Sequence, residues 1–137
     1  MFFALFCGEL KVSRKLVKIQ VIEMIEQYTK GSHMTVQGTT YYQDLKIIQG
    51  DVKDNWWRKE GHRLDDADIS DILSAKPDVL VIGTGYAGNM RVPMSLRTSI
   101  ESRDIKVIVE KTSEATKTFN RLFTRGKNVA GAFHLTC

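Results

Sequence analysis

Strands of the buried type alternate with helices through the second half of the chain, and this pattern most restricts the possible folds. The unbroken apolar run at 79–82 is typical of a strand that is buried on both faces of a sheet. Further strands are predicted at 105–109 and 128–133, with a helix before each. The order β-α-β-α-β predicts a mostly parallel sheet flanked by helices.

Capping signals mark where the helices begin. Asp65 is predicted to cap a helix over 65–75, with Asp68 in the capping-box position. Pro93 suits the first turn of a second helix. Thr112 is expected to cap a third helix that ends before Gly126.

The segment before Asp65 carries strand and turn signals instead. Strands are predicted at 34–36, 41–48 and 52–57, with glycine-containing turns between them. These signals indicate an antiparallel β meander. The length of 137 residues fits one domain, so the sequence predicts a single α/β domain with an N-terminal meander. Residues 1–23 stand apart, and Val17, Ile19 and Val21 alternate with polar residues as in a short strand.

Charge and cysteine content narrow the function classes. The net charge is +4, but residues 24–137 carry 16 basic against 14 acidic side chains, or +2. Nucleic-acid binding is therefore permitted but not expected. The two cysteines, Cys7 and Cys137, form no disulfide framework or zinc spacing. No apolar run approaches the roughly 20 residues of a membrane helix, and residues 1–7 lack the features of a secretory signal. A cytoplasmic protein with no membrane association is expected.

A glycine motif follows the run at 79–82. Gly83, Gly85 and Gly88 match the dinucleotide-binding pattern G-x-G-x-x-G, and Glu110 could be the ribose-binding acid. In the dinucleotide fold, however, the helix begins inside the glycine loop. Pro93 would then lie within that helix, at a cost of ~3 kcal/mol. We therefore expect no nicotinamide or flavin cofactor.

Two interpretations of the loop stay open. It could be a tight turn that needs positive φ. Alternatively, its free N–H groups and a nearby guanidinium could bind a small anion at the carboxyl end of a parallel strand. The candidate anion-binding residues are Gly83, Thr84, Gly85, Gly88, Asn89 and Arg91.

Histidine, cysteine and paired aromatic residues are the other candidates. His62, His134 and Cys137 could form a nucleophile pair or bind a metal. No metal-ligand spacing is present, and in an extended strand His134 and Cys137 would point to opposite faces. We therefore predict no catalytic and no metal site, with His62 and His134 at most at the rim of the glycine loop. In each of the pairs Trp56–Trp57 and Tyr41–Tyr42, one ring could be core and the other an exposed contact surface.

Several segments together resemble a family of small single-domain proteins that was first described structurally from a methanogenic archaeon. The family also includes the animal adipogenesis-associated protein and a mitochondrial complex I assembly factor. The resemblance covers about residues 25–137. The matching segments are 79–85, Gly88, Thr112, Ala115, 119–122 and 129–137, and upstream Tyr28, Gly31, Val36, Tyr42, Asp44, Leu45, Trp57 and 60–62.

The resemblance implies a three-layer α/β fold around a mixed sheet, with a small β meander packed on it. It implies no established activity and no established catalytic residues. We therefore expect a non-enzymatic binding or assembly module with a possible protein partner. A small-molecule anion-binding protein or enzyme that uses the 83–91 loop is the alternative. Because residues 1–23 lie outside the family pattern, we predict that translation starts at Met24 and that the domain comprises residues 24–137.

Overall fold

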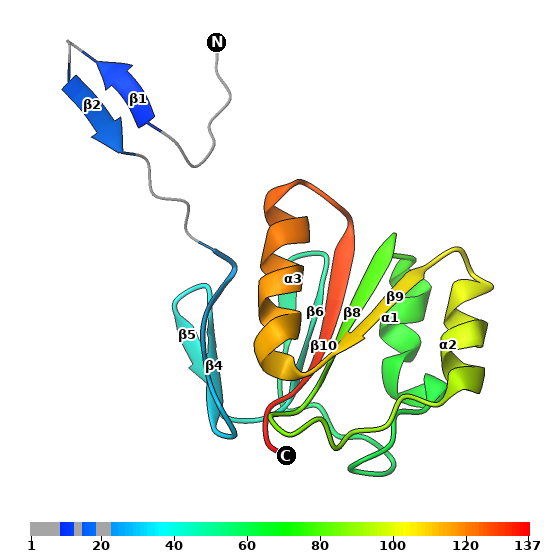
Figure 1. Ribbon diagram of the computed structural model, residues 1–137. Helices are drawn as coiled ribbons and strands as arrows, with labels where there is room; N and C mark the ends of the chain where they lie inside the picture. The colour runs from blue at the N-terminus through cyan, green and yellow to red at the C-terminus, as the bar shows by residue number, and fades with distance from the viewer. Residues whose placement is uncertain (1–8, 13–14, 19–22) are drawn as a thin grey trace.

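A five-stranded sheet forms the centre of the computed structural model, which describes residues 9–12, 15–18 and 23–137 (Figure 1). The strand order is β7-β6-β10-β8-β9. The strands are β6 (Leu45–Ile48), β7 (Asp51–Lys53), β8 (Val79–Thr84), β9 (Lys106–Glu110) and β10 (Val129–His134).

The direction of the strands confirms a mixed, mostly parallel sheet. β8 pairs in parallel with both β10 and β9. β6 is antiparallel to β10, and β7 is antiparallel to β6. Within this sheet, four strands therefore run in one direction and β6 runs in the other.

Side-chain alternation along β8 assigns each residue to one of two layers. Leu80 and Ile82 pack in a cluster with residues of the short 3₁₀ helix η1 (Asp66–Ile69), of α1 (Ser70–Ala75) and of α2 (Met94–Glu101). Val81 packs in a second cluster with Ala115 and Phe119 of α3 (Thr112–Thr124). Figure 1 shows α3 on one face of the sheet and α1 and α2 on the other, so the predicted three layers are present.

A second sheet packs on the α3 side. It has the order β3-β4-β5 and is antiparallel, with strands β3 (Ile25–Thr29), β4 (His33–Val36) and β5 (Thr39–Tyr41). Ile25, Met34 and Val36 are buried against the α3 face of the main sheet.

The predicted meander is thus divided between two sheets. The predicted single strand at 41–48 is wrong, because the chain leaves one sheet after Tyr41 and enters the other at Leu45. Residues 42–44 belong to neither ladder, and Asp44 bonds to side chains and to the end of β10 instead.

The N-terminal region contains a short hairpin. β1 (Glu9–Val12) pairs with β2 (Lys15–Lys18) in an antiparallel register. The alternation that we predicted across 17–21 extends beyond β2, and its later part lies outside the described residues. The start at Met24 and the domain boundary at 23/24 stay predictions.

The capping prediction at Asp65 is confirmed, and the predicted starts of the other two helices are each displaced by one residue. The capping box between Asp65 and Asp68 is present, although the helix begins as the 3₁₀ turn η1. Pro93 is the N-cap of α2, so that helix begins well beyond the glycine loop. The prediction for Thr112 is wrong, because the N-cap of α3 is Lys111.

The side chain of Asn120 joins the second sheet to α3. Its Oδ1 accepts a hydrogen bond from the Ile25 amide at 2.9 Å, and its Nδ2 donates to the Ile25 carbonyl at 2.8 Å. Both bonds are buried. One amide side chain therefore satisfies both backbone groups of the residue with which β3 begins.

The variant Asn120→Ala should lose about 2–6 kcal/mol of unfolding free energy, because two buried backbone groups lose their partner at about 1–3 kcal/mol each. Hydrogen exchange should accelerate most at β3 and β4, and less at β8 and β10. Arg121→Ala, at an exposed position on the same helix, is the matched control and should change stability by less than about 1 kcal/mol. Equal acceleration in both sheets would contradict this role for Asn120.

Candidate functional site

A cleft lies at the end of the main sheet where β8 and β10 finish. Its volume is about 390 Å³. His134, the last residue of β10, lies in register with Thr84 at the end of β8. The residues that line the cleft are Tyr42, Gln43, Asp44, Trp56, Trp57, Arg58, Gly61, His134 and Thr136.

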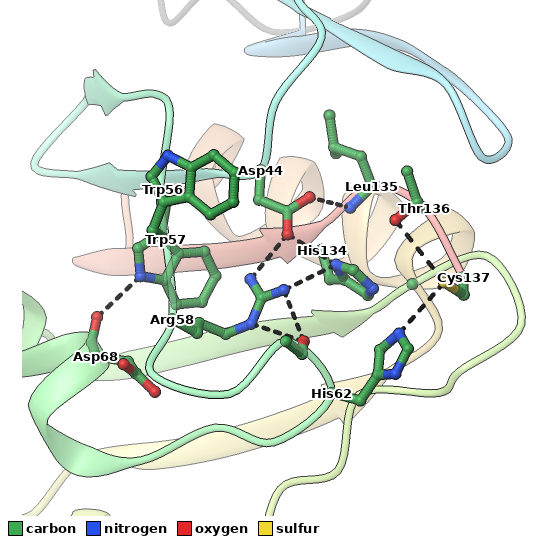
Figure 2. A network of polar contacts seen from close by, with 12 residues as sticks. Asp44, Trp56, Trp57, Arg58, His62, Asp68, His134, Leu135, Thr136 and Cys137 are labelled. Carbon is green, nitrogen blue, oxygen red and sulfur yellow. Dashed lines mark hydrogen bonds and ion pairs between the residues drawn. The ribbon is translucent and has the colours of Figure 1, made fainter.

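The Asp44 carboxylate is the centre of the polar network in this cleft (Figure 2). Its Oδ1 accepts a hydrogen bond from the Leu135 amide at 2.7 Å. Its Oδ2 accepts from Arg58 Nη1 at 2.8 Å and lies 2.7 Å from His134 Nδ1. Burial raises the pKa of Asp44, but the hydrogen bonds from His134, Leu135 and Arg58 outweigh it and lower the pKa below its usual value.

Arg58 is held from three directions. Besides Asp44, its Nε and Nη2 donate to the Gly61 carbonyl at 3.1 and 2.8 Å. Its guanidinium lies over the Trp56 ring, 4.8 Å from the centroid, in a cation–π arrangement. Trp56 is itself buried and donates from Nε1 to the Asp68 carbonyl. The floor of the cleft is therefore fixed before any ligand arrives.

The contacts of His134 define its tautomer. Nδ1 lies 2.7 Å from the Asp44 carboxylate, which only accepts when ionised, and 3.1 Å from Arg58 Nη2, which only donates. The contact with the carboxylate is the shorter of the two, so we assign the proton to Nδ1. The Nε2 atom is buried and has no hydrogen-bond partner among the described residues. The His134 side chain is 6% exposed.

His62 and Cys137 lie beside this ring. His62 Nε2 is 3.3 Å from Cys137 Sγ, and the His62 and His134 ring centroids are 5.7 Å apart. One ligating atom from each of the three residues lies within 4.8 Å of the others. The prediction that His134 and Cys137 point apart is wrong, because β10 ends at His134 and strand alternation does not extend to Cys137.

Each aromatic pair has one exposed member, and its other member is buried or partly buried. Trp56 is buried, whereas Trp57 is 76% exposed. Tyr42 is 66% exposed, whereas Tyr41 packs against the second-sheet core. Trp57 and Tyr42 both line the cleft, so two large exposed rings border its charged floor.

The glycine loop lies next to this site, but its backbone donors are occupied. Each amide from Gly85 to Arg91 donates within the protein. The Tyr86 amide donates to the Thr136 carbonyl, and those of Ala87 and Asn89 donate to the Cys137 carbonyl. The premise that this loop offers free N–H groups is therefore wrong. Anion binding there stays a prediction, and it would depend on the exposed Arg91 side chain.

Close packing explains the glycine at position 85. A Cβ atom on Gly85 would lie 2.4 Å from the Cys137 backbone carbon and 2.7 Å from His134 Cδ2, and its φ is +104°. Any side chain would displace the segment that carries His134 and Cys137. The Arg91 amide donates to the His62 carbonyl at 2.8 Å, so the backbone of His62 contacts the loop.

Sequence reasoning missed Asp44 and Arg58 as site residues. Asp44 appeared only within the family resemblance, and Arg58 carried no motif signal. Their partners are separated from them by up to 91 positions, and spacing along the chain does not report such contacts. An acid just before a buried strand and an arginine just after a Trp pair were the available signals.

The fold and site define a small α/β domain with a cleft at the carboxyl ends of parallel strands. Residues 25–134 match a family described as a protein of unknown function (DUF498/DUF598), and the chain belongs to that family.

Solved structures from several organisms have the same fold. A conserved hypothetical protein from Pyrococcus horikoshii OT3 is 26% identical, with a TM-score of 0.71 over 82% of this chain and 98% of that chain. A protein from Bartonella henselae that is described as an outer membrane protein is 25% identical, with a TM-score of 0.71 over 84% and 96%. A Bordetella pertussis protein described as a Mth938-like domain is 17% identical, with a TM-score of 0.59 over 88% and 92%, which shows the fold alone.

The described part of the chain contains no helix with the length and apolar character that crossing a bilayer requires.

The variant Asp44→Asn should destabilise the protein by about 3–5 kcal/mol at pH 7, because it leaves the buried Arg58 without its charge partner. The folded pKa of Asp44 is lowered, so its stabilisation is present above the unfolded value of about 3.9. It is lost as the pH falls through the lower folded pKa. The gap in unfolding free energy between wild type and variant should therefore narrow below about pH 4.

Urea unfolding at several pH values measures this gap. Asp51→Asn, at an exposed position in β7, is the control and should cost less than about 0.5 kcal/mol. If the difference in unfolding free energy between wild type and Asp44→Asn stays constant from pH 7 to acid pH, the assignment of Asp44 as an ionised carboxylate that stabilises the fold is refuted.

Proposed function

We propose that this domain is a non-enzymatic protein-binding module and that its contact surface is the aromatic rim of the cleft, Tyr42 and Trp57. The observation that carries the proposal is the exposure of these two rings, 66% and 76%, at a preformed cleft that both of them line. Tyrosine and tryptophan are enriched among the residues that dominate binding energy. Large exposed aromatics beside a concavity are typical of recognition sites.

The charges in the cleft favour an apolar contact. Asp44 and Arg58 neutralise each other at 2.8 Å, so the floor offers little net charge to a ligand. The volume of about 390 Å³ accommodates one or two side chains. The partner that fits is an extended polypeptide segment of another protein, with an apolar side chain packed against Tyr42 and Trp57.

Pre-organisation supports binding by this surface. Arg58 is fixed by Asp44, Gly61 and Trp56, so little conformational entropy is lost at the floor when a partner docks. The resemblance to a family that includes a complex assembly factor also favours assembly over catalysis. The anion-binding alternative at the 83–91 loop is weaker, since its amides are already bonded.

The variant Trp57→Ala should weaken partner binding by about 30-fold, which corresponds to roughly 2 kcal/mol for a dominant interface residue. The partner is first identified by affinity capture with wild-type protein, and affinities are then measured with both proteins purified. Tyr42→Ala should weaken binding in the same direction.

Met94→Ala is the matched control, because Met94 is 69% exposed on α2 and does not line the cleft. Its affinity should equal that of wild type. Undiminished binding by both aromatic variants would exclude this surface. Native mass spectrometry that shows a bound small anion in place of a protein partner would favour the alternative.

A further inference from the structure

Three potential metal ligands from separate segments meet beside the cleft. His62 lies in the loop before Leu64, His134 ends β10, and Cys137 follows it. One donor atom of each lies within 4.8 Å of the others. Figure 2 shows His62 and Cys137 directed toward each other with His134 beside them.

The unpaired nitrogen of His134 is the observation that points to a ligand. His134 is buried, and its Nε2 has no hydrogen-bond partner among the described residues. Buried polar atoms are almost always paired, so an orphan needs an explanation. Its Cδ2, next to Nε2 in the ring, lies 2.7 Å from the position of a Cβ on Gly85, as does the Thr136 carbonyl oxygen. The free edge of the ring therefore faces the segment that carries Cys137.

The other nitrogen of His134, Nδ1, makes the hydrogen bond to a carboxylate that is common among metal-binding histidines. Its Nδ1–H donates to Asp44 Oδ2 at 2.7 Å. A carboxylate in this position fixes the tautomer, orients the ring and makes Nε2 a better ligand. Asp44 is in turn fixed by Arg58 and the Leu135 amide.

We propose that His62, His134 and Cys137 bind a zinc ion through two imidazole nitrogens and one thiolate. Zinc takes such nitrogen and sulfur donors, and three protein ligands leave a fourth tetrahedral position open. Binding forms a Zn–S bond and releases the thiol proton to solvent.

The geometry needs only a small adjustment. Tetrahedral zinc with bonds of about 2.0–2.3 Å places its ligand atoms roughly 3.3–3.6 Å apart. His62 Nε2 and Cys137 Sγ already lie 3.3 Å apart. Both of these residues are exposed, so their side chains can rotate to close the remaining distance to the fixed His134. A simple Cys137–His62 nucleophile pair would leave His134 Nε2 unexplained.

The test is a zinc titration of metal-free protein against a competing chromophoric chelator. Cys7→Ser serves as the background, since Cys7 is the only other cysteine in the sequence. One zinc should bind per chain with a Kd below about 1 μM. Cobalt in place of zinc should give a thiolate-to-metal charge-transfer band.

Variants at exposed ligands separate binding from folding. His62→Gln and Cys137→Ser should each weaken zinc binding by more than the roughly 10–100-fold expected for loss of a supporting residue such as Asp44. Their circular dichroism should match that of the background protein. His33→Gln, at the third histidine of the chain, is the matched control and should bind zinc normally.

Two results would overturn the proposal. One is the absence of one-to-one binding below about 1 μM in the background protein. The other is unchanged affinity in folded His62→Gln and Cys137→Ser variants. The zinc proposal does not depend on the proposed protein-binding surface, because Trp57 is not one of the three ligands. Trp57→Ala should therefore leave zinc affinity unchanged.

Discussion

The Asp44 carboxylate is the interaction on which the arrangement of this site depends. One of its oxygens fixes the backbone at Leu135, and the other fixes both Arg58 and His134. A buried ion pair adds little net stability, because the cost of desolvation offsets the attraction. Its physical effect here is positional. Three short segments from different parts of the chain keep one relative placement, because the Asp44 side chain bonds to the two others, at Arg58 and at His134–Leu135.

The layers of the fold could be predicted from local patterns. The buried run at 79–82, the proline at 93 and the capping box at Asp65 each act over a few residues, and each appears where expected. The break between Tyr41 and Leu45 could not be predicted in this way. Most residues from Tyr41 to Ile48 favour a strand, and the long-range bonds of Asp44 accompany the break in the ladder. Tertiary context overrides strand propensity in such segments.

The site was harder to predict than the fold, for a related reason. The glycine motif suggested free backbone donors, but the amides from Gly85 to Arg91 all bond within the protein, three of them to the carbonyls of Thr136 and Cys137. The geometry that makes a loop suitable for an anion also makes it suitable for a neighbouring chain segment, and the sequence pattern is the same in both cases. The prediction that the His134 and Cys137 side chains point to opposite faces assumed that strand alternation continues beyond His134, where β10 ends. The end of a strand is hard to predict from a sequence pattern. Here, the end of β10 at His134 allows the side chains of His134 and Cys137 to lie close together.

The position of His134 links the two halves of the site. Its Nδ1 side belongs to the charged floor of the cleft through Asp44, and its Nε2 side faces the segment of Cys137. The glycine loop encloses that segment, since Gly85 permits backbone contact that a Cβ would prevent. The backbone of the loop therefore holds residues 134–137 in place through hydrogen bonds and close packing. Asp44 Oδ2 bonds to both Arg58 and His134. A displacement of Arg58 would therefore also affect the position of the His134 ring. The aromatic rim and the His62–His134–Cys137 cluster consequently share one rigid support, although they present different chemistry to solvent.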